Sequence, residues 1–347
     1  MALAIAEIMD IEYIWTSDSD SLVYPETIHQ TMCTMAGDAN VGGASTSLYI
    51  HNAKDTVVTQ MTNGVYLTEL YLARSFFGAT SANDCQSGPC AAFRAVALPR
   101  ILLKWYKQSV MGHWMVVNED RHLTTRLMLD GWKTIFVSDV LTATETPRTL
   151  RGWLLQQVRW ARAVHIETLH RPQVYLLQSP ILFFGALRRQ MSVFLIPLNV
   201  ALYLLLGRPF YWKFTAIDIA NRIIWTTFYL GLRNPYPAGK GSWIYILPAQ
   251  IFYNIPLPAV QLWSLLTVTT DGWGTTMRAE KSPRVSLKTK AFDMGFFVLW
   301  LSMLGATLGR WVASWNDLAT SQVLLCQGAA GILCLFGLGV WLVRLQY

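Results

Sequence analysis

Hydrophobic and polar positions follow one pattern up to about Pro172 and a different one beyond it. In the first part, short β-prone runs alternate with segments of helical periodicity, an arrangement that predicts an α/β domain built on one sheet. The β-prone runs are residues 11–16, 41–50 and 134–137, and the helical segments are residues 22–35, 55–77, 119–132 and 150–170. We therefore expect residues 1–172 to form an α/β domain, with helix 150–170 leading out of it.

Beyond Pro172 the chain consists mainly of long apolar segments. Each is long enough for the roughly 20 residues that a bilayer core requires. The segments are residues 190–206, 214–232, 243–268, 291–313 and 321–343. We expect residues 173–347 to form an all-α transmembrane domain, with helix 150–170 lying at the membrane interface.

Basic residues predict which of these segments cross the membrane. Arginines precede the first span, and a second basic group lies between residues 278 and 290, after the third segment. Positively charged flanks favour the cytosolic side, so an even number of crossings separates the two groups. The segment 243–268 also contains three prolines. It is expected to be interfacial or re-entrant, which leaves four spans and returns the loop 270–278 to the cytosolic face.

Composition supports a membrane protein. Hydrophobic residues make up 53% of the chain and charged residues 14%, against about 25% charged in soluble domains. The net charge of +7 is concentrated beside the apolar spans, so we expect a lipid bilayer and no nucleic acid as partner. The five cysteines lack zinc spacing. Cys85 and Cys90 are close enough in sequence to pair, although a reduced cytosolic setting is favoured.

Two acidic residues follow the first β-prone run. Asp18 and Asp20 stand at i and i+2, just past the carboxyl end of that run, where open α/β sheets bind ligands. Hard oxygen ligands of this kind suit Mg²⁺ or Mn²⁺ held together with a substrate diphosphate. An ordinary acidic turn is the alternative interpretation.

Three further short stretches are candidates for the same site. Residues 87–89 (Ser-Gly-Pro) form a turn that backbone or ligand can approach closely. Glu119 and Asp120 stand at the head of a periodic segment, where carboxylates face unpaired backbone N–H groups. Gln156, Arg159 and Trp160 share one helical face, which suits an anionic ligand. A surface arginine stacked on a tryptophan explains the last pattern equally well.

Taken together, these stretches resemble the membrane-integrated, processive family 2 glycosyltransferases, most closely the hyaluronan synthases and their fungal relatives that make capsule and cell-wall polysaccharide. The matching stretches occur in family order at residues 17–20, 41–43, 87–89, 118–124, 145–147, 156–160 and 272–275. The resemblance implies a glycosyltransferase-A-like α/β domain with an incomplete Rossmann-like sheet. It also implies transfer of a sugar, with inversion, from a UDP-sugar donor to a polysaccharide acceptor that passes through the membrane helices.

By that resemblance, Asp18 and Asp20 help to hold the metal and the donor diphosphate, and Asp120 is the general base. The other implied roles concern supporting, acceptor-binding and gating residues. Glu119, Ser87, Gly88 and Pro89 support the site, Gln156, Arg159 and Trp160 contact the acceptor end and the diphosphate, and Trp273, Gly274 and Thr275 form a gating loop. The resemblance places the protein in a membrane, with the plasma membrane expected and the catalytic domain in the cytosol.

The chain departs from the family in two ways. Asn118 stands where relatives carry glycine, and the amino-terminal part of the family pattern, which includes the uridine-binding half-domain, does not precede Met1. We therefore expect the carboxy-terminal portion of the catalytic domain. The alternatives are a truncated, catalytically silent membrane scaffold or partner of a complete synthase, and a transporter or channel. The pattern is equally compatible with UDP-GlcNAc, UDP-GlcA and UDP-Glc as donor.

Overall fold

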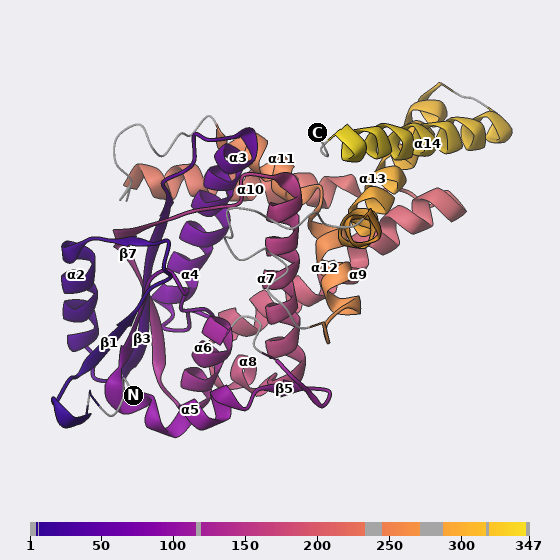
Figure 1. Cartoon of the computed structure of the whole chain (residues 1–347). Helices are drawn as coiled ribbons and strands as arrows, with labels where there is room; N and C mark the ends of the chain where they lie inside the picture. The colour runs from indigo at the N-terminus through magenta and orange to yellow at the C-terminus, as the bar shows by residue number, and fades with distance from the viewer. Residues whose placement is uncertain are drawn as a thin grey trace.

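The computed structural model describes residues 5, 7–115, 119–232, 245–270, 287–316 and 319–344. Its amino-terminal part is built on a five-stranded sheet with the strand order β1-β4-β3-β7-β2 (Figure 1). The strands are β1 (Tyr13–Thr16), β2 (Leu22–Val23), β3 (Val41–Ile50), β4 (Ala91–Arg94) and β7 (Lys133–Thr144), and a separate hairpin pairs β5 (Ser109–Val110) with β6 (His113–Trp114). The expected α/β domain is confirmed.

The sheet is mixed. β3 runs parallel to β7, whereas the pairs β1–β4, β3–β4 and β2–β7 are antiparallel. The central strand β3 is rich in small residues, which lets neighbours approach it closely. A Cβ on Gly42 would lie 2.6 Å from the Cβ of Trp132, so this position accepts no larger side chain without rearrangement.

Helices cover both faces of the sheet. Helix α2 (Pro25–Ala36) packs on one face against β3 and β7, and α4 (Ala73–Ala79) and α6 (Glu119–Leu129) contact the sheet from the other side (Figure 1). The helix expected from residue 22 begins instead at Pro25, because Leu22 and Val23 pair with β7. Proline is well suited to the first helical position, where its missing N–H has no partner to lose.

The helix expected over residues 55–77 is present, but it is not α-helical throughout. It consists of α3 (Val57–Val65), a π-helical segment η1 (Tyr66–Leu72) and α4. Shorter elements follow before the acidic pair at the head of α6. They are the 3₁₀ turn η2 (Ala95–Ala97) and helix α5 (Pro99–Tyr106).

The second part is helical and is joined to the first by α7 (Leu150–His170). The remaining helices are α8 (Gln173–Leu177), α9 (Pro180–Leu206), α10 (Trp212–Leu232), α11 (Ile246–Asn254), α12 (Leu257–Leu266), α13 (Leu287–Trp315) and α14 (Thr320–Arg344). Trp153 and Val158 of α7 are buried in one cluster with Val260 of α12 and Phe297 of α13. α13 and α14 lie side by side at the carboxyl end (Figure 1).

Two of the described helices are long and apolar enough to cross a membrane, namely α9 and the portion Ala291–Trp315 of α13. α10 carries Asp218 and Arg222, and the described apolar part of α14 is shorter. The segment expected to be broken by prolines consists of two short helices, α11 and α12, on either side of residues 255–256. The four-span arrangement stays a prediction, and residues 271–278 of the expected loop lie outside the described residues.

A buried polar pair joins α6 to α7. Nδ1 of His122 lies 2.8 Å from a carboxylate oxygen of Glu167, and both side chains are almost fully buried. Burial lowers the pKa of His122 below its usual value of 6.5, even though Glu167 acts in the opposite direction. Because the unfolded chain binds this proton more readily, His122 contributes stability above about pH 6.5 that is lost as the pH falls.

We predict that the replacement His122→Gln, which keeps an N–H donor for Glu167, becomes less damaging at low pH. The difference in melting temperature between wild type and variant, followed by differential scanning fluorimetry, should be larger at pH 7.5 than at pH 5.5. The corresponding change in free energy is at most about 1.4 kcal/mol per pH unit. The matched control is His29→Gln, at an exposed position. A gap for His122→Gln that stays constant with pH would contradict the prediction.

Candidate active site

One large cavity lies between the sheet domain and the helical part. Its volume is about 1810 Å³. Its wall includes residues from four stretches that are far apart in sequence. They are Asp18 and Asp20 after β1, residues 87–89 before β4, Glu119 and Asp120 of α6, and Gln156, Arg159 and Trp160 of α7. All the described residues that the sequence assigns to the site therefore line a single space.

The Asp120 carboxylate is held at the amino-terminal end of α6 by donors from two segments. Its Oδ1 atom accepts the backbone N–H of Arg121 at 2.7 Å. Its Oδ2 atom accepts the backbone N–H of Gly88 at 3.4 Å and the thiol of Cys85 at 3.6 Å. The carboxylate is thus oriented from the helix on one side and from the stretch 85–88 on the other.

Asp18 approaches the same glycine from a different direction. A Cβ on Gly88 would lie 2.9 Å from Oδ1 of Asp18, closer than side chains tolerate. The neighbouring turn is tied to the end of β1, because the hydroxyl of Ser17 donates to the carbonyl of Pro89 at 3.0 Å. Gly88 therefore lies in contact with both carboxylates, and the absence of a side chain there is what allows this arrangement.

Glu119 supplies a further carboxyl group to the cavity, next to Asp120 at the head of α6. Burial, followed by the nearby negative charge of Asp120, raises the pKa of Glu119 to about 6. Its backbone carbonyl accepts the indole N–H of Trp105 at 2.8 Å, which fixes the start of the helix. The Glu119 carboxyl group can therefore gain or release a proton near neutral pH beside the proposed base.

The α7 face forms another part of the cavity wall. Gln156, Arg159 and Trp160 are half-buried rather than spread over an outer surface. The ring of Trp160 lies 6.2 Å from that of Tyr66, measured between centroids, and Trp160 packs against a buried cluster that contains Leu48. The expected common face is present, and it lines the same cavity as the carboxylates.

Several lining residues were not identified in the sequence. Arg74 of α4 donates to the hydroxyl of Ser87, and Tyr66 and Glu69 enter the cavity from η1. In the sequence they interrupt an apolar stripe that is typical of core packing, and a π-helical stretch has no clear sequence signal. The local sign of a role in the site was the presence of Glu69 and Arg74 within a largely apolar helical segment.

The acidic residues fit a divalent ion only in part. Among the described residues there is no group of three or more His, Cys, Asp or Glu side chains placed to hold a metal. Asp18 and Asp20 supply two carboxylates on the cavity wall. Mg²⁺ is commonly held by one or two carboxylates, with substrate phosphates and water completing its shell. The residues therefore suit an ion that is bound jointly with a diphosphate.

Two elements of the expected site fall outside the described residues. Asn118 precedes the start of α6, and Trp273, Gly274 and Thr275 belong to the stretch after α12. The gating role assigned to Trp273, Gly274 and Thr275 stays a prediction.

Comparison with known proteins finds similarity to one family in the amino-terminal part. Residues 4–163 match the model of the glycosyltransferase-like family 2. Hyaluronan synthase 3 of Homo sapiens is 26% identical over 282 residues, which cover 77% of this chain and 48% of that protein. An N-acetylglucosaminyltransferase of Rhizobium meliloti (strain 1021) is 29% identical over 272 residues, covering 77% of this chain and 62% of that protein.

The chain thus spans about half the length of the hyaluronan synthases that it matches. Among solved structures, a mannosyltransferase of Pyrobaculum calidifontis in complex with GDP-Man and Mn²⁺ superimposes with a TM-score of 0.38 and 20% identity. That alignment covers 73% of this chain and 65% of the mannosyltransferase. The likeness is too distant to support an argument about the site.

The cavity geometry predicts which cysteines react with alkylating reagents. Cys85 is buried against Asp120, and burial together with that negative charge raises the pKa of its thiol to about 12. Because the thiolate is the reactive form, iodoacetamide at pH 8 should modify exposed Cys33 at least about 100-fold faster than Cys85. Peptide mass spectrometry of the folded protein measures both rates, and denaturation should equalise them. Equal rates in the folded protein would contradict this burial.

Proposed function

We propose that this chain, whose residues 4–163 form a family 2 glycosyltransferase domain of hyaluronan synthase-like sequence, transfers a sugar from a UDP-sugar to a growing polysaccharide. The product would be an extracellular or cell-wall polymer. The observation that carries the proposal is that all the described residues assigned to the site by the family resemblance line one cavity. A core packing role would not require four carboxyl groups and a glutamine–arginine–tryptophan face to share one space.

Asp120 is the general base in this proposal. Glycosyl transfer to an alcohol requires a group within hydrogen-bond reach of the acceptor hydroxyl. The Asp120 carboxylate takes that proton as the acceptor oxygen bonds to the anomeric carbon, while the bond from this carbon to the diphosphate oxygen breaks and UDP leaves. A single displacement of this kind inverts the anomeric configuration. The donors on Gly88 and Cys85 orient the carboxylate for this step.

Charge on the departing diphosphate is balanced by the rest of the cavity wall. Asp18 and Asp20 would hold Mg²⁺ or Mn²⁺, which neutralises charge on the leaving group when bound. Arg159 supplies a planar guanidinium, whose geometry suits two phosphate oxygens at once. Trp160 is held by Tyr66 and gives an apolar surface against which a sugar ring can pack.

Membrane attachment is supported by the helical part. α9 and the apolar portion of α13 are long enough to span a bilayer. They expose large apolar side chains, among them Phe184, Leu205 and Leu299. Exposed apolar area of this extent marks a lipid or protein contact in a folded chain. We propose an integral membrane protein, in the plasma membrane, with the α/β domain in the cytosol and the polymer leaving between the helices.

We predict metal-dependent release of UDP by the chain in nanodiscs, with one of the donors UDP-GlcNAc, UDP-GlcA or UDP-Glc. Replacing Asp120 by Asn should lower turnover by about 100-fold or more, because general-base catalysis contributes on that scale. Binding of the donor, measured by isothermal titration calorimetry with Mn²⁺, should change little.

The outcomes separate the proposal from the silent alternative. Folded protein that binds a donor but releases no UDP under any condition would favour a scaffold or partner subunit. Normal turnover in Asp120→Asn would remove Asp120 as the base while leaving the reaction class standing.

Gly88→Ala tests the contact between the turn and the two carboxylates. The new Cβ would lie 2.9 Å from Oδ1 of Asp18, so the carboxylate must move away from its present position. We expect turnover to fall by about tenfold or more, since small displacements of reacting groups have effects of this size. Raising the Mn²⁺ concentration should restore part of the loss.

The matched control is Gly295→Ala in α13, where a Cβ would meet nothing within 4 Å. This variant should keep the wild-type turnover and melting temperature. Wild-type activity and metal dependence in Gly88→Ala would refute the role given to the turn.

A further inference from the structure

Asp84 is a buried carboxylate that binds two arginines. It is 7% exposed, and its Oδ2 atom accepts hydrogen bonds from Arg121 at 2.7 Å and from Arg189 at 3.2 Å. Burial alone would raise the pKa of Asp84, but the two guanidinium charges outweigh it and hold that pKa well below its usual range. Asp84 is therefore negatively charged throughout the physiological pH range.

Two connections link the Asp84 carboxylate to the segment that carries the proposed base Asp120. Asp84 precedes Cys85, whose thiol donates to Asp120, and its partner Arg121 follows Asp120 in the chain. A third bond joins the same segments, from the N–H of Gln86 to the hydroxyl of Thr124 at 2.8 Å. The stretch 84–88 is therefore bonded to the first turns of α6 along its length, and Asp84–Arg121 is the ion pair in this set.

Arg189 brings α9 into the same contact. The next residue of α9, Gln190, lies 3.1 Å from Nδ1 of His165 on α7, between side-chain atoms. α9 thus contacts both the carboxylate beside the base and the helix that carries Arg159. It is also one of the two helices, among the described residues, that are long and apolar enough to span a membrane.

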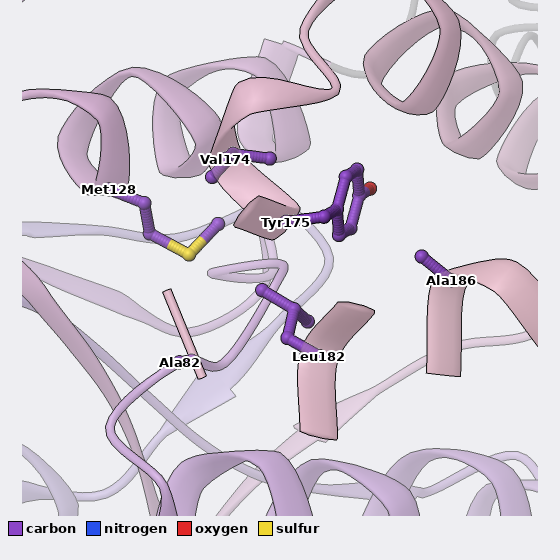
Figure 2. Close-up of a cluster of buried hydrophobic side chains, with 6 residues drawn as sticks. All are labelled: Ala82, Met128, Val174, Tyr175, Leu182 and Ala186. Carbon is purple, nitrogen blue, oxygen red and sulfur yellow. The ribbon is translucent and has the colours of Figure 1, made fainter. Parts of the chain in front are cut away.

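An apolar cluster packs α9 against α6, α8 and the stretch that precedes Asp84. Figure 2 shows side chains of α6, α8 and α9 converging with the backbone stretch that precedes Asp84. The cluster consists of Ala82, Met128, Val174, Tyr175, Leu182 and Ala186. Its members are nearly or fully buried, so α9 cannot shift without moving the stretch 82–84 or repacking the cluster.

We infer that Asp84 is a positioning residue: by binding Arg121 and Arg189 together, it holds the Asp120 carboxylate toward the cavity and couples its position to that of α9. The inference rests on the proposed function, because it takes Asp120 as the base. The inference links α9, a helix long and apolar enough to span a membrane, to the Asp120 carboxylate. A change in the position of α9 would reach Asp120 through one buried side chain.

A purely structural ion pair makes a different prediction. It would affect the amount of folded protein and its melting temperature, and the protein that did fold would keep its kcat. A positioning residue lowers kcat in the folded protein and leaves the donor KM nearly unchanged, because the donor contacts are elsewhere in the cavity.

The experiment compares Asp84→Asn, Asp84→Glu and Arg189→Gln in nanodiscs. For Asp84→Asn we expect kcat of UDP release to fall by about 10- to 100-fold, with the donor KM within about twofold of wild type. Asp84→Glu keeps the charge and should recover part of the loss. Arg189→Gln should have a smaller effect, and combining it with Asp84→Asn should add nothing further, since both act through one contact.

The matched control is Asp38→Asn, which removes an aspartate paired with Lys133 at 2.8 Å on the exposed side of the domain. Its kcat should equal that of wild type. An independent readout is Cys85, which should be alkylated faster in Asp84→Asn than in wild type if the stretch 84–88 loosens from α6. This readout requires no catalytic activity.

Unchanged kcat and unchanged Cys85 reactivity in folded Asp84→Asn would overturn the inference. In that case the proposed function would still stand, provided that Asp120→Asn is inactive. Absence of UDP release from the folded wild type would overturn both. If Asp84→Asn does not fold, the kcat of Arg189→Gln tests the inference instead. This variant removes the contact with α9 and leaves the Asp84–Arg121 pair in place. Full additivity of Arg189→Gln with Asp84→Glu would then count against the coupling.

Discussion

The site depends on the close approach of a glycine to two carboxylates from different parts of the chain. Asp18 comes from the end of β1 and Asp120 from the start of α6, and both contact Gly88. Like charges brought together in a partly buried space raise each other's free energy. Burial first, and then the negative charge of Asp120, raises the pKa of neighbouring Glu119. Backbone N–H donors and nearby arginines offset part of this repulsion, and a bound cation would offset more. The arrangement therefore favours ligands that carry a cation with them.

α7 supports this site because it is anchored along its length. Its buried face packs through Trp153 and Val158 against α12 and α13, and its far end is fixed to α6 by the Glu167–His122 pair. The cavity face between these anchors carries Arg159 and Trp160. A binding face on a helix held in this way is positioned more accurately than one on a loop. The same anchors join the α/β domain to the helical part, so the cavity is formed by both.

Much of the architecture followed from the sequence, because strands and helices with regular apolar spacing carry their own signal. Asp18, Asp120 and Arg159 were recognised because their stretches have distinctive residue types at fixed spacing. The roles of Arg74, Asp84 and Arg189 were not recognised, since each residue acquires its role only when distant segments meet. The start of α2 was misplaced because local periodicity does not report that Leu22 pairs with β7. Long-range contacts of this kind carry no local pattern.

The π-helical segment η1 shows how one helix serves both the core and the cavity. Leu67 and Tyr71 are buried against Leu230 of α10 and Ile246 of α11, whereas Tyr66 and Glu69 reach the cavity. Glu69 also pairs with Arg222 of α10. A π-helix has more residues per turn than an α-helix, so the side chains after it are rotated relative to those before it. Tyr66 contacts Trp160, and Arg74, about two turns later, donates to the hydroxyl of Ser87. The stretch from η1 to α4 therefore serves the core through Leu67 and Tyr71, and the cavity wall through Tyr66, Glu69 and Arg74.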